Sequence, residues 1–108
     1  MDYRVKLNLL IYNKNRSNHI RGSIDVLLPF APSIGIHIQY KDMYPLQTTR
    51  VEWITEQECF NCIVEDDLTG YEFDMDTDID ELIDDYDVLR DAKEYGWVGF
   101  DKIFRDDW

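Results

Sequence analysis

The sequence contains few of the residues that hold small secreted or metal-stabilised domains together. It has two cysteines, two histidines, five glycines and three prolines in 108 residues. Two cysteines are too few for the disulfide framework of a small secreted domain and suit a reducing compartment. The low glycine and proline content argues against a low-complexity or disordered chain.

Long hydrophobic runs and short enzyme motifs are also missing. The longest apolar run near the N-terminus, residues 9–12, is far too short for a signal peptide or a spanning helix. No nucleophile elbow, glycine-rich phosphate loop or H-E-x-x-H motif is present. We therefore expect a cytoplasmic protein with no enzymatic activity, no cofactor and no membrane association. The alternative is a metal-dependent enzyme, which the finding of a stoichiometric bound metal would support.

Positive charge is scarce, above all in the second half of the chain. Lysine and arginine total 11 against 23 aspartates and glutamates, which gives a formal net charge of −12. Residues 1–55 carry seven bases and four acids, whereas residues 56–108 carry four bases and nineteen acids. The acidic second half of the chain would repel phosphates, so we expect no direct nucleic-acid binding. The asymmetry itself indicates a charged interaction surface.

The apolar residues that are present predict a single α+β domain over residues 1–108. Alternating apolar and polar positions are typical of half-buried strands. The first two expected strands form a long hairpin with a basic outer face, joined by a polar turn at 13–18. Strands are expected at residues 3–11, 20–28, 34–40, 49–55, 59–65 and 71–75.

At Thr77 or Asp78 the apolar period changes from two to about 3.6 residues. Either residue can cap a helix, and Glu81 lies three positions after Asp78, as in a capping box. Gly96 is a natural end, so one helix of roughly five turns is expected, with residues 97–108 forming a final strand or a short helical turn. The predicted fold class is an antiparallel sheet or small open barrel of about six strands, with one C-terminal acidic amphipathic helix packed on it.

One face of this predicted helix carries a row of carboxylates. Asp80, Asp84, Asp87, Asp91 and Glu94 are spaced four, three, four and three residues apart, which places them on one side. The row would extend over roughly 21 Å and is comparable to a nucleic-acid backbone in sign and scale. A purely solvated helix usually mixes lysine with glutamate, although an acidic solubility face is the competing interpretation. The predicted partner-binding residues are Asp74, Asp76, Asp80, Glu81, Asp84, Asp85, Asp87, Asp91, Glu94 and, as an aromatic anchor, Trp108.

Residues 74–78 have the D-x-D-x-D spacing of a calcium loop. An EF-hand loop also needs glycine at its sixth position and glutamate at its twelfth. Ile79 and Asp85 occupy these positions, so we predict no calcium site.

Cys59 and Cys62 form an isolated C-x-x-C motif. Residues three apart on a strand point to opposite faces, too far apart for a disulfide without a local turn. A zinc site would also need both histidines. Buried free thiols are therefore the favoured interpretation.

In charge and size the chain resembles the DNA-mimic proteins that phages and mobile elements use against host defence nucleases. The resemblance is compositional and includes no motif. It implies an inhibitor whose carboxylates occupy a basic surface of a partner protein, such as a nucleic-acid-binding enzyme. An immunity protein that neutralises a basic toxin nuclease would use the same physics. A third interpretation is an assembly module that self-associates as a homo-oligomer through its basic hairpin and acidic helix.

Overall fold

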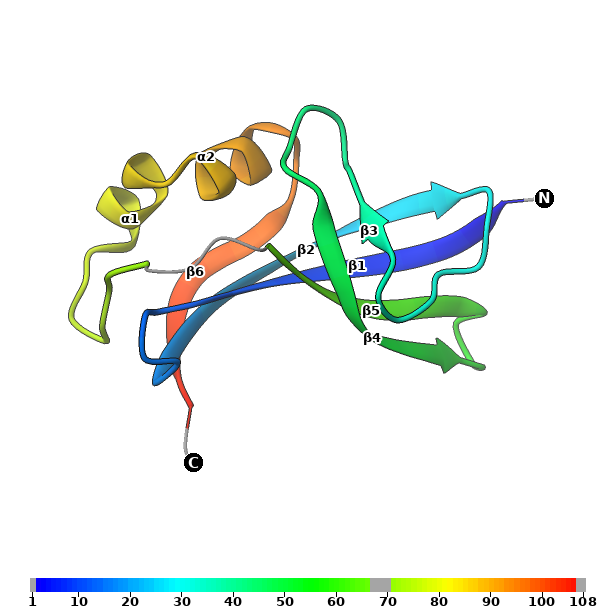
Figure 1. Cartoon of the computed structure of the whole chain (residues 1–108), viewed down its shortest axis with the longest axis horizontal. Helices are drawn as coiled ribbons and strands as arrows, with labels where there is room; N and C mark the ends of the chain where they lie inside the picture. The colour runs from blue at the N-terminus through cyan, green and yellow to red at the C-terminus, as the bar shows by residue number, and fades with distance from the viewer. Residues whose placement is uncertain (1, 67–70, 107–108) are drawn as a thin grey trace.

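The computed structural model describes residues 2–66 and 71–106. Six strands form one mixed sheet in the order β3-β4-β5-β1-β2-β6, and two short helices lie together at one end of it (Figure 1). The predicted α+β class is therefore confirmed. The elements are β1 (Tyr3–Tyr12), β2 (Asn18–Leu28), β3 (His37–Ile38), β4 (Leu46–Ile54), β5 (Cys59–Asp66), α1 (Ile79–Asp85), α2 (Asp87–Glu94) and β6 (Val98–Arg105).

The long hairpin of β1 and β2 forms the middle of the sheet. Its register runs without interruption from Tyr3 opposite Leu28 to Tyr12 opposite His19. The apolar positions of β1 alternate into the core, as the sequence predicts, because successive strand residues face opposite sides. The buried set in this strand is Val5, Leu7, Leu9 and Ile11.

The sheet is mixed rather than antiparallel, and it is not closed into a barrel. β1 pairs in parallel with β5, with Val5 opposite Phe60 and Leu9 opposite Val64, whereas the other four strand pairs are antiparallel. The expectation of an antiparallel sheet was wrong because alternation reports which face of a strand is buried and contains no information on the direction of its neighbour.

The sixth strand is β6 and not the predicted segment 71–75. Tyr71 and Phe73 are buried and alternate with exposed neighbours, which explains the strand-like pattern. Their backbone carbonyls accept hydrogen bonds from the β1–β2 turn, 2.8 Å from Lys14 N and 3.0 Å from Asn13 Nδ2. The segment is thus tied to a turn and adds no strand to the ladder. The predicted strand at 34–40 is likewise reduced to the two residues of β3.

The predicted single helix is interrupted at Tyr86, so the expectation of one five-turn helix was wrong. Tyr86 is extended, with φ −118° and ψ 123°. Its hydroxyl accepts a 2.8 Å hydrogen bond from the backbone N–H of Glu72, and its ring packs edge-on against Tyr71 at 4.6 Å. The interruption places Asp87 in the first turn of α2, where the helix dipole favours a negative charge.

The predicted helix ends are correct on both sides of the interruption. Asp78 is the N-cap of α1, and its Oδ1 accepts a 2.9 Å hydrogen bond from Asp80 N. Gly96 follows α2 with φ +93°, the left-handed conformation in which glycine is favoured. Trp97 N then donates to Ala92 O at 3.0 Å and closes the last turn.

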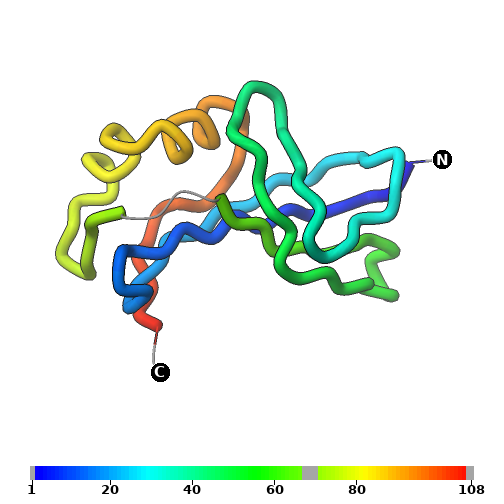
Figure 2. The backbone as a smooth tube through the Cα atoms, in the orientation of Figure 1, coloured from blue at the N-terminus to red at the C-terminus, as the bar shows by residue number. Residues whose placement is uncertain are grey.

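The connection between β2 and β4 brings an early part of the chain to the helical end of the sheet. Figure 2 traces this connection across the sheet and up to a loop beside α2. There the rings of Tyr40 and Tyr95 meet edge-on at 6.4 Å. Within the described part of the chain, no helix is long and apolar enough to cross a membrane.

Candidate acidic docking surface

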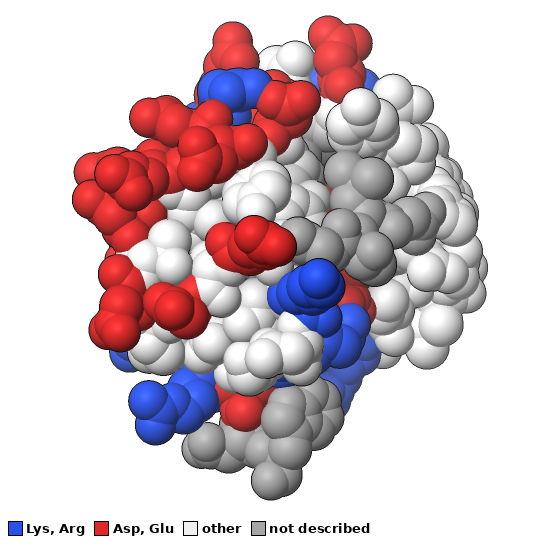
Figure 3. All heavy atoms as spheres, turned by 60° about the vertical axis from the view of Figure 1, so that its left-hand side comes forward, with Lys and Arg blue, Asp and Glu red and all other residues white. Residues whose placement is uncertain are grey.

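The two helices and the segment that precedes them carry a dense set of carboxylates. Between residues 71 and 95 the chain has eleven acids and two bases. Ten of these acids are exposed, and Asp91 is half-buried. Figure 3 shows carboxylates gathered over the helical end of the molecule, with most of the lysines and arginines visible in this view lying below them. We call this set the acidic layer: Glu72, Asp74, Asp76, Asp78, Asp80, Glu81, Asp84, Asp85, Asp87, Asp91 and Glu94.

The predicted straight row of five carboxylates does not exist as one helix face. Asp80 and Asp84 lie on α1, whereas Asp87, Asp91 and Glu94 lie on α2 beyond the extended residue. The interruption divides the row between two helices. The prediction of regular spacing along one helix axis is therefore wrong.

Two carboxylates of the layer have structural roles. Asp74 Oδ1 accepts hydrogen bonds from Asp76 N at 2.9 Å and from Thr77 Oγ1 at 3.3 Å, which folds residues 74–77 into a tight turn. Asp78 caps α1 through Asp80 N, as described above. These acids fix the local backbone, so substitutions that remove them would change both charge and structure.

Arg90 links the two helices across the interruption. Its Nη1 donates a 2.8 Å hydrogen bond to the backbone carbonyl of Asp84 in the last turn of α1, and its Nη2 pairs with the Asp87 carboxylate. One of the two bases in the layer is therefore used internally. Asp87 of the predicted row is correspondingly already paired within the chain.

The D-x-D-x-D segment forms this turn and the start of a helix. A calcium loop would direct its carboxylates toward one central point. Among residues 2–66 and 71–106, no group of three or more histidines, cysteines, aspartates or glutamates is arranged to hold a metal ion.

The cysteines are both buried, as the sequence predicts. Burial raises the pKa of the Cys62 thiol to about 11. The neutral thiol is thus strongly favoured near neutral pH, and Cys62 is a small apolar core residue rather than a nucleophile.

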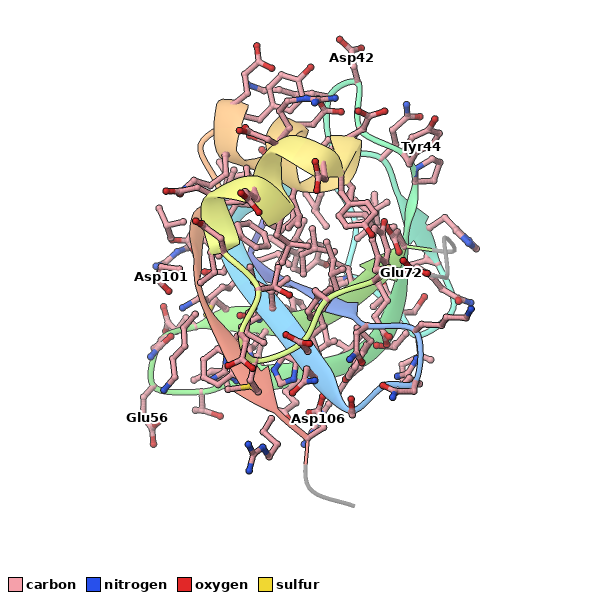
Figure 4. The ribbon with its side chains drawn as sticks, turned by 90° about the vertical axis from the view of Figure 1, so that its left-hand side faces the viewer. Asp42, Tyr44, Glu56, Glu72, Asp101 and Asp106 are labelled. Atoms are coloured by element: carbon pink, nitrogen blue, oxygen red, sulfur yellow. The ribbon has the colours of Figure 1, made fainter. Side chains whose placement is uncertain are left out.

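The edge of the acidic layer includes residues that sequence reasoning missed. Tyr95 Oη lies 3.5 Å from Asp42 Oδ2, so the acid-poor first half adds a carboxylate beside α2. Tyr44 on the same loop is 56% exposed, and Met75 is 42% exposed. Figure 4 shows Asp42 and Tyr44 on the loop beside the helices, with Glu72 below them. The sequence held no signal for this, because the position of the loop depends on the path between β2 and β4.

Tyr44, on the loop beside the helices, and Met75, between Asp74 and Asp76 in the chain, are exposed side chains that could act as anchors. The predicted anchor, Trp108, lies outside the described residues. Comparison with protein-family models, with curated proteins and with solved structures finds no match for this chain. The interpretation of the acidic layer therefore depends on its own geometry and charge.

Proposed function

We propose that the chain is an acidic binding protein whose acidic layer occupies a basic, nucleic-acid-binding surface of a partner protein. The observation that carries this proposal is the set of ten exposed carboxylates in one contiguous part of the chain, accompanied by two bases. A protein that binds in this way inhibits or regulates its partner by competing with nucleic acid for the same surface.

Electrostatic repulsion within the layer supports a role beyond solubility. Like charges at helical spacing destabilise a helix by about 0.2–0.5 kcal/mol per pair. In α1 the last turn contains no basic residue, although a cation there would interact favourably with the helix dipole. Asp84 and Asp85 occupy that turn instead. This arrangement is unfavourable for folding and favourable for meeting a positively charged surface.

The acidic layer also combines two features of protein–protein interfaces, a surface of one charge and exposed anchor side chains. Complementary charge steers association and gives specificity, whereas much of the affinity comes from a few buried apolar or aromatic anchors. Tyr44 lies on the loop beside the helices and Met75 lies between Asp74 and Asp76 in the chain, and both are exposed. We propose that the carboxylates set the association rate and that these two side chains contribute to the lifetime of the complex.

The experiment compares three forms of the protein. The layer variant carries Asp80→Asn, Glu81→Gln, Asp84→Asn and Glu94→Gln, which spares the capping and turn residues Asp74 and Asp78 and the paired Asp87. The control variant removes the same amount of charge from exposed positions outside the layer: Asp2→Asn, Asp25→Asn, Glu56→Gln and Glu58→Gln. Proteins retained from a lysate of the native host by each immobilised form are identified by mass spectrometry.

A retained basic protein is then purified and tested with a labelled DNA duplex. We expect wild type and the control variant to displace the duplex, and the layer variant to displace it at least about tenfold less effectively. Equal displacement by all three forms would show that the layer is only a solvated face. The identity of the partner separates the two versions of the proposal: a host defence nuclease indicates anti-defence, and a toxin nuclease indicates immunity. Both versions place the protein in the cytoplasm.

A further inference from the structure

The outer face of the β1–β2 hairpin carries a row of three rings. Tyr12, His19 and Phe104 come from β1, β2 and β6. The Tyr12 and His19 ring centroids are 5.5 Å apart, and the His19 and Phe104 rings stack at 5.2 Å with an interplanar angle of 14°. His19 Nδ1 also lies 2.8 Å from Asp106 Oδ1, which fixes the central ring. The row is therefore an ordered surface on three adjacent strands.

Cations cover this row. Arg16 lies 3.9 Å from the Tyr12 ring centroid and pairs with Glu65 at 3.6 Å. At the other end, Arg21 and Lys102 both lie over Phe104, at 3.9 and 5.0 Å from its centroid. Two positively charged side chains thus lie over the same ring, that of Phe104.

Across residues 2–66 and 71–106, neither Arg21 nor Lys102 forms an ion pair with an acid. Both side chains are exposed. Two cations over one ring repel each other, and the attraction of each cation to an exposed ring is weak. An anion placed between them would relieve the repulsion.

A shallow hollow lies next to this pair. It is lined by Asn8, Arg21, Gly22, Ser23, Gly99 and Phe104, and by one carboxylate, Asp101. Val98 also borders it and is 66% exposed. The hollow thus combines hydrogen-bond donors, an aromatic wall and an apolar edge beside two cations. We call Arg21, Lys102, Phe104 and this hollow the cationic face.

We infer that the cationic face binds carboxylates from the acidic layer of a second copy of this chain. The charges of the two surfaces are complementary: Arg21 and Lys102 outnumber the one carboxylate of the hollow, Asp101, whereas the acidic layer has eleven acids with two bases among them. Arg21 and Lys102 lie on β2 and β6, whereas the acidic layer lies on α1, α2 and the segment before them, so the two surfaces use different residues of one copy. A nucleic acid fits less well, because a net charge of −12 repels a polyanion along its whole length.

The net charge also sets the conditions under which the contact forms. At about 0.15 M salt the screening length is about 8 Å. Repulsion between whole molecules with extents of 43 × 31 × 23 Å is then largely screened. Contact-range pairs persist at that ionic strength and weaken as salt rises further.

Sedimentation velocity at increasing protein concentration tests this inference. A cationic-face variant, Arg21→Gln with Lys102→Gln, is compared with wild type, with the layer variant and with a charge-matched control, Lys14→Gln with Arg50→Gln. We expect wild type and control to self-associate at 0.15 M salt, and each of the other two variants to dissociate about tenfold or more readily. A mixture of the cationic-face and layer variants is expected to form a complex, because each supplies the surface that the other lacks.

Three results would overturn the inference: wild type that stays monomeric at all concentrations, variants that associate as wild type does, or a mixture that forms no complex. Binding of a labelled single-stranded oligonucleotide by monomeric wild type, lost in the cationic-face variant, would assign the face to nucleic acid instead. The cationic-face variant keeps the acidic layer intact. It should therefore still compete with DNA for the partner of the proposed function, so the two proposals can fail separately.

Discussion

The ring of Phe100 lies so close to Gly22 that a β-carbon on this glycine would be 2.3 Å from Phe100 Cε2. Phe100 is buried and adopts a φ of +56°, directly after Gly99 at φ +104°. The register between β2 and β6 shifts at this point, between the pairs Ile20–Ile103 and Gly22–Gly99. The irregularity turns a large aromatic ring into the core across a strand that has no side chain at that position.

Replacing Gly22 by alanine should destabilise the protein by about 1–3 kcal/mol. The added methyl group overlaps an enclosed aromatic ring, and overpacking in a core has an effect of this size. The measurement is urea denaturation followed by tryptophan fluorescence. Phe100→Leu provides the control, because a smaller side chain leaves room for the methyl group. The double variant should lose less stability than the sum of the two single variants; strict additivity would contradict the contact.

The N-cap of α1 gives a prediction that separates charge from hydrogen bonding. Asp78→Ala should reduce the free energy of unfolding by about 1 kcal/mol, whereas Asp78→Asn should retain most of it, because asparagine also caps helices. Asp76→Ala is the matched control, since it removes the same charge two residues earlier. Thermal unfolding measured by circular dichroism distinguishes the three variants. An equal loss in Asp78→Asn and Asp78→Ala would assign the effect to charge.

Local sequence patterns predict the elements whose partners are close in the chain. The β1–β2 hairpin follows from strict alternation on both sides of a polar turn, and the ends of the helical region follow from Asp78 and Gly96. The interruption at Tyr86 was not predictable, because the apolar stripe continues through it. It depends on Glu72 and Tyr71, whose positions are set by hydrogen bonds to the β1–β2 turn.

The same limit applies to the two surfaces. The acidic composition predicts that an acidic layer exists, but its shape depends on the interrupted helix and on the loop carrying Asp42. For the cationic face, the sequence predicted only that the outer face of the hairpin is basic. The arrangement of its side chains depends on β6. Lys102 and Phe104 lie beside Arg21 because β2 pairs with β6, which is distant in the sequence.

The buried thiol of Cys62 gives a prediction on pH. Because its pKa is raised from 9.0 to about 11, its thiolate fraction at pH 8 is roughly 100-fold lower than in the unfolded chain. Iodoacetamide labelling followed by peptide mass spectrometry should show that Cys62 in the folded protein reacts at least roughly 100-fold more slowly than in protein unfolded in urea. Labelling at the unfolded rate would contradict the buried position.

The direction of the same shift also predicts how stability depends on pH. Folding favours the neutral thiol, so this contribution is complete below pH 9 and is lost as pH rises toward about 11. Cys62→Ser or Cys62→Ala would remove this part of the dependence. If the free energy of unfolding of wild type, relative to that of the variant, increased as pH rises from 9 to about 11, the prediction would be contradicted.

Repulsion within the acidic layer predicts an unusual response to salt. The melting temperature of wild type should rise with added NaCl, because salt screens like charges held together by the fold. The layer variant should be more stable than wild type at low salt and should respond less to NaCl. The control variant, with the same net charge, should lie closer to wild type. If the layer and control variants respond alike, net charge explains the effect and the layer has no special repulsion.

The most direct test of the acidic layer as a docking surface is the association rate constant with the partner, measured by stopped flow across ionic strength. For wild type and the control variant the rate should fall steeply, by about tenfold or more, between 0.05 and 0.5 M NaCl. For the layer variant it should be slower at low salt and nearly flat, with all three forms converging at high salt. Equal rates and equal salt dependence for the layer and control variants would contradict the central claim that these carboxylates guide binding.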